Sequence, residues 1–236
     1  YDIYIENLFG IDIQDYSLER TKIILELLAY SYGEDRAFQF NLLHADTLDF
    51  KTADWPMAYS GFDVIVGNPP YSCSRNVSKE TKEKMRNYSV CISGHPDLYI
   101  PFFQIAVEML SDNGILGYIT MNSFFRSVNG RAVRKFFSDS GFDITLIDFR
   151  DHQMFRSRNT YTCLFFLDKS IRNHTVHYML NETGDLTREQ IFNNIEYDKL
   201  NDFQGWLLNS HEKALHFESA GIPIRKYCSS RHGIAT

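Results

Sequence analysis

The amino-acid sequence predicts an α/β protein built on a doubly wound sheet, and three observations support this. Short apolar segments of strand length alternate with longer amphipathic segments of helix length. The short segments are apolar at nearly every position, which is typical of strands that helices cover on both faces. The last two of them, residues 144–149 and 161–167, are joined by a polar loop with no room for a helix, so an antiparallel hairpin should end the sheet.

Apolar spacing and turn residues place the individual elements. Strands are expected at residues 8–13, 38–45, 62–67, 115–121, 144–149 and 161–167. Helices are expected at residues 16–32, closed by Gly33, at 97–110, closed by Asn113-Gly114, and at 130–140. Residues 72–96 are polar and aperiodic, with a charged middle (SKETKEKMRN) that could be helical, which favours a functional loop. After Asp168 the pattern weakens and favours a strand at 174–179 and short helices at 187–194 and 210–219.

The composition is that of a folded chain that needs no cross-links. A chain of 236 residues with 44% hydrophobic and 15% aromatic residues can bury a core of its own. Its four cysteines form no C-x-x-C pair, which argues against a zinc site or a disulfide framework and suits a reducing cytoplasm. No apolar stretch approaches the roughly 20 residues of a membrane span, so we expect a cytoplasmic protein without a membrane partner. The chain begins at Tyr1 and runs directly into an apolar segment, and we expect it to be a fragment.

Polar residues end the first three predicted strands, where open α/β sheets bind their ligands. Asp12 ends the first strand and could accept hydrogen bonds from ribose hydroxyls, or it could cap the helix that begins near Asp15. Asp46 ends the second strand and could accept a hydrogen bond from an adenine amino group, or it could cap a turn with Thr47.

The third strand runs directly into Asn68, Pro69, Pro70 and Tyr71. Two prolines after a buried strand make a stiff, extended segment that holds the Asn68 side chain and the Pro69 carbonyl side by side as acceptors. Two acceptors beside an aromatic ring suit a planar amino group. When both N–H groups of that amine are accepted, its nitrogen becomes pyramidal, and the lone pair is then free to attack a methyl group. A plain proline turn after a strand is the alternative.

In this context the sequence resembles the class I AdoMet-dependent methyltransferases, whose Rossmann-like sheet ends in an antiparallel hairpin. The resemblance covers residues 4 to about 168 and is strongest to the gamma-order adenine-N6 DNA methyltransferases of restriction-modification systems, the TaqI-like and type IIG group. The segments that carry it are NLFGIDI, HADTLDF, VGNPPY, HPDLYIPFFQIAVEML, GILGYITMNSFF and MFRSRNTYTCLFFLDK.

The resemblance implies roles for individual residues. S-adenosylmethionine would lie against Asp12, Ile13, Asp46, Thr47 and Asn68, with Asp12 at the ribose and Asp46 at the adenine amino group. Asn68, Pro69, Pro70 and Tyr71 would form the catalytic segment. Tyr71 and Phe155 would clamp an adenine that has been flipped out of double-stranded DNA.

The resemblance also implies a domain organisation. Residues 1–170 would form the catalytic domain, and residues 171–236 would lead toward a target-recognition domain. The first strand and its glycine-rich loop would precede residue 1, and that strand would lie between residues 8–13 and 62–67 in the sheet. A nuclease could be fused to the parent protein or act as a separate subunit. The cationic side chains of Lys79, Lys82, Lys84 and Arg86 could face solvent or contact DNA.

Three alternatives remain open. Glutamine methyltransferases that act on release factors also use NPPY, but they lack a long insertion such as residues 72–96. A cytosine-N4 enzyme usually carries serine or aspartate in place of Asn68. A methyltransferase-like subunit that binds DNA without catalysis is the alternative from a different functional class.

Overall fold

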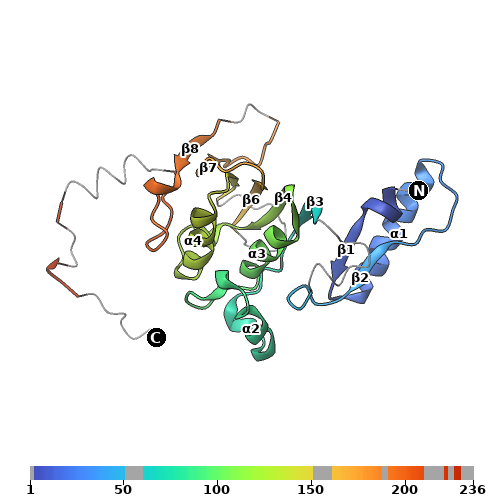
Figure 1. Cartoon of the computed structure of the whole chain (residues 1–236), viewed down its shortest axis with the longest axis horizontal. Helices are drawn as coiled ribbons and strands as arrows, with labels where there is room; N and C mark the ends of the chain where they lie inside the picture. Colours follow the sequence, from blue (N-terminus) through green and yellow to red (C-terminus); the bar gives the residue numbers. More distant parts are fainter. Residues whose placement is uncertain are drawn as a thin grey trace.

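The computed structural model describes residues 3–50, 61–150, 161–187, 191–209, 221–222 and 226–229 (Figure 1). Within these residues the chain forms a mixed α/β structure with two sheets. The strands are β1 (Phe9–Asp12), β2 (Asn41–His44), β3 (Phe62–Gly67), β4 (Leu110–Met121), β5 (Ile144–Asp148), β6 (Thr162–Asp168), β7 (Thr175–Leu180) and β8 (Asn193–Glu196). The α-helices are α1 (Asp15–Ser31), α2 (Lys79–Met85), α3 (Ile100–Met109) and α4 (Arg131–Ser140). None of the described helices combines the length and apolar character needed to cross a bilayer.

The larger sheet has the strand order β3-β4-β6-β5-β7-β8. Strands β3, β4, β5 and β7 run in one direction, while β6 is antiparallel to both of its neighbours. The antiparallel pairing of the predicted hairpin is confirmed, because β5 and β6 pair with Leu146 opposite Phe165, but β5 is not the last strand of the sheet. The sheet continues past residue 170, since β7 lies parallel to β5 and β8 pairs with β7.

Helices α3 and α4 cover one face of the larger sheet. The rings of Phe103 in α3 and Phe137 in α4 lie 4.9 and 5.2 Å from the ring of Phe165 in β6. All three side chains are completely buried. Gly141 follows α4 as its C-cap residue, and its φ of 68° is a left-handed conformation that glycine adopts without strain. The aromatic core therefore lies between these two helices and the sheet.

The opposite face of the larger sheet is less covered than the sequence predicts. Val66 on β3 is 77% exposed, and Ile115 on β4 and Phe166 on β6 also reach solvent. Doubly wound sheets have helices on both faces, whereas α3 and α4 both pack on the same face of this sheet.

The smaller sheet consists of β1 and β2, which pair in parallel and are connected by α1. The ring of Phe9 in β1 lies 5.4 Å from the ring of Phe62 in β3, so the two sheets touch at this point. Among the described strands, β1 pairs with β2 alone and β3 pairs with β4 alone. That a further strand lies between β1 and β3 stays a prediction.

Two local predictions are wrong. The helix expected at residues 187–194 is absent from the described part of that range, where β8 begins at Asn193 and buries Ile195 opposite Val176 of β7. Asn113-Gly114 does not end α3, which stops at Met109. That turn signal lies inside β4, where the pairing with β3 shifts register. The helix expected at residues 210–219 lies outside the described residues.

Candidate functional site

The carboxyl ends of the parallel strands bring polar residues to one edge of the larger sheet. Asn68 follows β3, Asn122 follows β4, Asp148 ends β5 and Asn181 follows β7. Because these four strands run in one direction, all four residues lie at the same edge. This is the edge at which open α/β sheets bind ligands.

The NPPY segment follows β3 as chain without regular secondary structure. Pro69 is buried and Asn68 is exposed. Among the described residues, none makes a hydrogen bond with the side chain of Asn68, so its amide oxygen remains available to a ligand. Gly67 precedes it, and a Cβ atom there would lie 3.0 Å from the ring of Tyr118, so a larger residue would require that ring to shift.

Tyr71 is half-buried and held by its hydroxyl group, which donates a hydrogen bond to the carbonyl oxygen of Ile119 in β4 at 3.1 Å. Burial raises the pKa of Tyr71 to about 12, so the phenol remains neutral and keeps donating. The bond fixes one end of the ring beside Asn68 and the prolines. Held in this way, the Tyr71 ring is suited to stacking against a planar group.

Asp12 is half-buried at the end of β1, and its Oδ1 atom accepts a hydrogen bond from the backbone N–H of Gln14 at 2.7 Å. The N-cap residue of α1 is Gln14, so Asp12 caps the turn that precedes the helix and does not cap the helix itself. The described residues leave its Oδ2 atom without a partner, so Asp12 can still accept hydrogen bonds from a ligand. The neighbouring side chain of Ile13 is 62% exposed.

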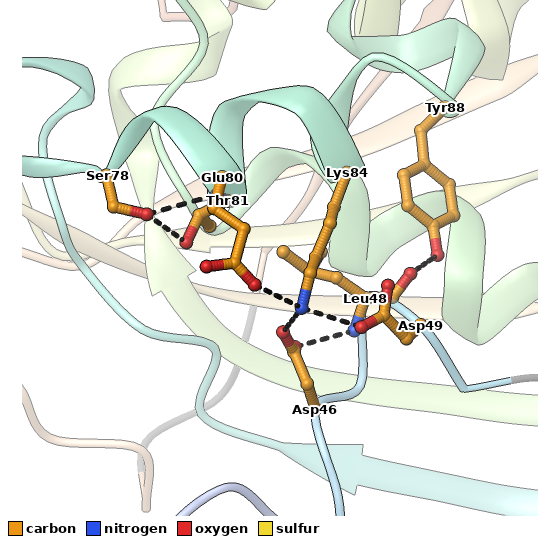
Figure 2. Close-up of polar contacts among 8 residues, drawn as sticks. All are labelled: Asp46, Leu48, Asp49, Ser78, Glu80, Thr81, Lys84 and Tyr88. Atoms are coloured by element: carbon orange, nitrogen blue, oxygen red, sulfur yellow. Dashed lines mark hydrogen bonds and ion pairs between the residues drawn. The ribbon is translucent and has the colours of Figure 1, made fainter.

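Asp46 both caps a turn and forms an ion pair (Figure 2). Its Oδ1 atom accepts a hydrogen bond from the backbone N–H of Leu48 at 3.0 Å, which caps the turn that contains Thr47. Its Oδ2 atom lies 2.8 Å from Nζ of Lys84 in α2. The sequence left the role of Lys84 open, and the structure places it against this carboxylate.

Helix α2 connects the predicted catalytic segment to the predicted cofactor segment. It lies in the chain that follows NPPY, and the backbone bond from Leu98 to Ser72 closes the base of that insertion. At the far end, the hydroxyl group of Tyr88 donates to the carbonyl oxygen of Leu48 at 2.7 Å. The turn after β2 and the insertion after β3 therefore lie against each other.

A second polar cluster at this edge could not be identified from the sequence. Asp148 is buried, and it accepts hydrogen bonds from the side chain of Asn122 at 2.7 Å and from the hydroxyl of Tyr178 at 3.0 Å. Its Oδ1 atom also accepts from the backbone of Arg150, which has a left-handed φ of 47°. Asn122 follows β4, Asp148 ends β5 and Tyr178 lies in β7, so no local spacing connects the three side chains.

The structure brings some of the predicted site residues together. Asn68, Pro69, Pro70 and Tyr71 lie at the end of β3, and Asp46 is linked through Lys84 to the insertion that follows them. Asp12 is connected to the Asp46 segment through its backbone, since its carbonyl oxygen accepts a hydrogen bond from the N–H of Ala45 at 3.1 Å. Phe155 lies outside the described residues.

Comparisons with known proteins agree with this architecture. The family model of the Eco57I restriction-modification methylase matches residues 6–155. The type II restriction enzyme and methyltransferase RM.Eco57I of Escherichia coli is 35% identical over 133 residues, which are 54% of this chain and 13% of that protein. The type II methyltransferase M.BstVI of Geobacillus stearothermophilus is 39% identical over 79 residues, 34% of this chain and 14% of that protein. The chain thus spans a small part of these relatives.

Solved structures share the fold. The DrdV–DNA complex superposes with a TM-score of 0.66 and 18% identity, covering 87% of this chain and 25% of that one. A class I S-adenosylmethionine-dependent methyltransferase from Listeria monocytogenes gives a TM-score of 0.53 and 17% identity, covering 77% of this chain and 51% of that one. The fold is therefore that of the class I methyltransferases. Because the family model matches well over half of its residues, the chain belongs to the Eco57I restriction-modification methylase family.

Proposed function

We propose that this chain is part of the catalytic domain of a DNA methyltransferase that transfers a methyl group from S-adenosylmethionine to the N6 amino group of adenine. The observation that carries the proposal is the side chain of Asn68 at the carboxyl end of β3, which no described residue hydrogen-bonds and which lies beside Pro69 and the anchored ring of Tyr71. Family membership favours DNA as the substrate over the release-factor glutamine that the sequence left open.

The residues at the ends of β1 and β2 fit the adenosine half of S-adenosylmethionine. Asp12 has a carboxylate oxygen that no described residue bonds and that could accept hydrogen bonds from ribose hydroxyls, and the exposed side chain of Ile13 can pack against the nucleoside. Asp46 would accept a hydrogen bond from the adenine amino group, with Thr47 beside it. When bound, the cofactor supplies an electrophilic methyl group.

In the proposed reaction, the protein acts on the target nitrogen. The Asn68 amide oxygen and the Pro69 carbonyl each accept one N–H of the target amino group, which draws its lone pair out of conjugation with the ring. The lone pair would then form the new N–C bond as the S–C bond of the cofactor breaks, S-adenosylhomocysteine would leave, and the nitrogen would lose a proton to solvent. No strong base is required before attack, because the proton becomes acidic only as nitrogen gains positive charge.

The target base must leave the duplex to reach this edge of the sheet. Tyr71 would stack on one face of the extruded adenine, and Phe155, outside the described residues, would contact the other. Stacking on an aromatic side chain contributes about 1–3 kcal/mol per base. Double-stranded DNA is thus the proposed macromolecular partner, and the DrdV structure was determined as a DNA complex.

The relatives are much longer than this chain, which is consistent with further domains in the full-length protein. The sequence predicts a catalytic domain at residues 1–170 and a segment at 171–236 that leads to a target-recognition domain. Because β7 and β8 continue the same sheet, the catalytic unit would extend at least to Glu196. The name RM.Eco57I joins a restriction enzyme and a methyltransferase in one protein, which is consistent with a nuclease fused to the parent chain or supplied by a separate subunit.

The decisive experiment is Asn68→Ala in the full-length enzyme. Loss of one acceptor for the reacting group should lower kcat by a factor on the order of 10² or more, with little change in cofactor affinity. Transfer of tritiated methyl groups to DNA, followed by nucleoside analysis, measures the rate and identifies the methylated base.

Asn193→Ala is the matched control, because Asn193 is an exposed asparagine on β8 of the same sheet and should tolerate alanine. Near-normal turnover by Asn68→Ala would exclude the proposed mechanism. Methylated cytosine among the products would instead exclude adenine as the target.

A further inference from the structure

We infer that Lys84 is a positioning residue of the cofactor site, which holds the Asp46 carboxylate where it accepts the adenine amino group. This inference rests on the proposed function, because it assumes that Asp46 contacts the cofactor. It adds to that function a residue from the insertion after NPPY, a segment for which the sequence left a solvated or DNA-contacting role equally open.

The contacts of Lys84 carry the inference (Figure 2). Its Nζ atom lies 2.8 Å from Oδ2 of Asp46 and 2.6 Å from Oδ2 of Asp49, and 3.7 Å from Oε1 of Glu80. The Lys84 side chain is 23% exposed and that of Asp46 is 24% exposed, so this pair is shielded far more than an ordinary surface pair. Lys84 therefore lies among three carboxylates and contacts the predicted adenine acceptor directly.

The hydrogen bonds at Asp46 fix its orientation without exhausting it as an acceptor. One carboxylate oxygen accepts from the backbone of Leu48 and the other accepts from Lys84. A carboxylate has about four lone-pair positions, so two donors leave room for a third. With both oxygens held, the plane of the carboxylate is set before a ligand arrives, which lowers the entropic cost of binding.

Electrostatics make the position of Lys84 important. Hydrogen bonds from Lys84 to Asp46 and Asp49 raise the pKa of its ammonium group well above the ordinary value, so it stays charged at neutral pH. Without that charge, Asp46 and Asp49 would repel each other across the turn, and the Asp46 side chain would rotate away. A neutral side chain at position 84 therefore removes both the donor and the charge that keep Asp46 in place.

The backbone around Lys84 is itself anchored. Ser78 caps the start of α2 by accepting from the N–H of Thr81 at 3.0 Å, and Tyr88 beyond its end is bonded to the carbonyl oxygen of Leu48. The cap thus orders the first turn of α2, and the Tyr88 bond attaches the chain beyond its end to the turn after β2. A long side chain on a fixed helix reaches its target with little loss of freedom.

The experiment compares Lys84→Met with Lys84→Arg in the full-length protein. Titration calorimetry with S-adenosylhomocysteine should show about tenfold weaker binding for Lys84→Met, while Lys84→Arg retains most of the affinity. With saturating S-adenosylmethionine, kcat should change by less than about twofold, so the effect appears in KM. Lys135→Met is the matched control, since Lys135 forms an exposed ion pair of 2.8 Å with Asp139.

A second ligand separates this inference from the proposed function. S-inosylhomocysteine carries an oxo group in place of the adenine amino group, so a correctly held Asp46 should reject it. We expect the unmodified protein to prefer S-adenosylhomocysteine and Lys84→Met to lose much of that preference. In an Asp46→Asn background, Lys84→Met should have no further effect on affinity, because the two residues act through one contact.

The outcomes are distinct. Unchanged affinity in Lys84→Met with the amino preference intact would overturn the inference and leave the proposed cofactor site standing. Tighter binding by Lys84→Met would also overturn it, because Lys84 would then compete with the cofactor. Absence of any preference for the amino form in the unmodified protein would remove Asp46 from the cofactor site, and both proposals for this residue would fail.

Discussion

The larger and smaller sheets are built from similar sequence patterns, yet they differ sharply in burial. In the larger sheet, Phe103 and Phe137 of the covering helices are completely buried. In the smaller sheet, α1 buries only Leu18 and Ala29, while Ile24 and Leu27 are each more than 60% exposed. Apolar residues at helical spacing therefore predict that a helix forms, but they do not predict how much of its apolar face the described residues bury.

The difference has a simple energetic basis. Burial of apolar surface contributes about 25 cal/mol per Å², and the larger sheet has two helices that supply such surface. The smaller sheet has two four-residue strands and one helix, and such a unit is rarely stable by itself. Its described connections to the rest of the molecule include the Phe9–Phe62 contact, the buried side chains of Leu48 and Phe50, and the Lys84 ion pairs.

The largest effect is expected in the core of the larger sheet. Phe103→Ala should lower the free energy of unfolding by about 3–5 kcal/mol, because it leaves a cavity among Phe124, Phe137 and Phe165. Urea denaturation measures the change. The control is Phe203→Ala, since that ring is 68% exposed and lies beneath Arg131. Equal losses in both variants would show that the core does not dominate stability.

A smaller loss in the free energy of unfolding is expected for Arg134→Met. The guanidinium group of Arg134 is completely buried and donates hydrogen bonds to the carbonyl oxygens of Phe124, Ser127 and Asp202. Methionine fills much of the volume but leaves these acceptors without their donors, at a cost of about 2–3 kcal/mol. The exposed Arg172 provides the control, and comparable unfolding midpoints for Arg134→Met and Arg172→Met would contradict this prediction.

The smallest effect is expected on α1. Ile24 is 61% exposed, so Ile24→Ala should change the free energy of unfolding of the 236-residue chain by less than about 0.5 kcal/mol. Repeating the measurement in a longer chain with an added upstream segment sharpens the comparison, because a partner for α1 would raise the cost. A loss above about 1 kcal/mol in the 236-residue chain would mean that this face is already covered.

Local patterns predicted most of the fold, and long-range pairing decided the rest. The strands at residues 62–67 and 161–167 and the helix at 16–32 follow from apolar spacing, and the structure has them within one or two residues. Strand β8 was missed because its pairing with β7 depends on burying Ile195, which no local rule reveals. Asn113-Gly114 is a strong turn signal. In the structure it lies inside β4, because β4 pairs with β3 both before and after it and the register shifts in between.

The candidate site divides in the same way. The NPPY segment and Asp12 were identified because each ends a strand, and the structure places them there. Lys84 could not be assigned, because its partner Asp46 lies 38 residues away in the sequence. The Asn122, Asp148 and Tyr178 cluster was invisible for the same reason, since its members come from three strands.

The place of β6 in the larger sheet has a consequence for the order of folding. Strand β6 lies between β4 and β5, although it follows both in the chain. Until it arrives, β4 and β5 each present an unpaired edge, and they cannot close on each other without blocking its position. Pairing of β4 with β6 also joins residues far apart in sequence, which slows folding. Insertion of β6 is thus the step that completes the core, and a chain delayed before it exposes two strand edges to other molecules.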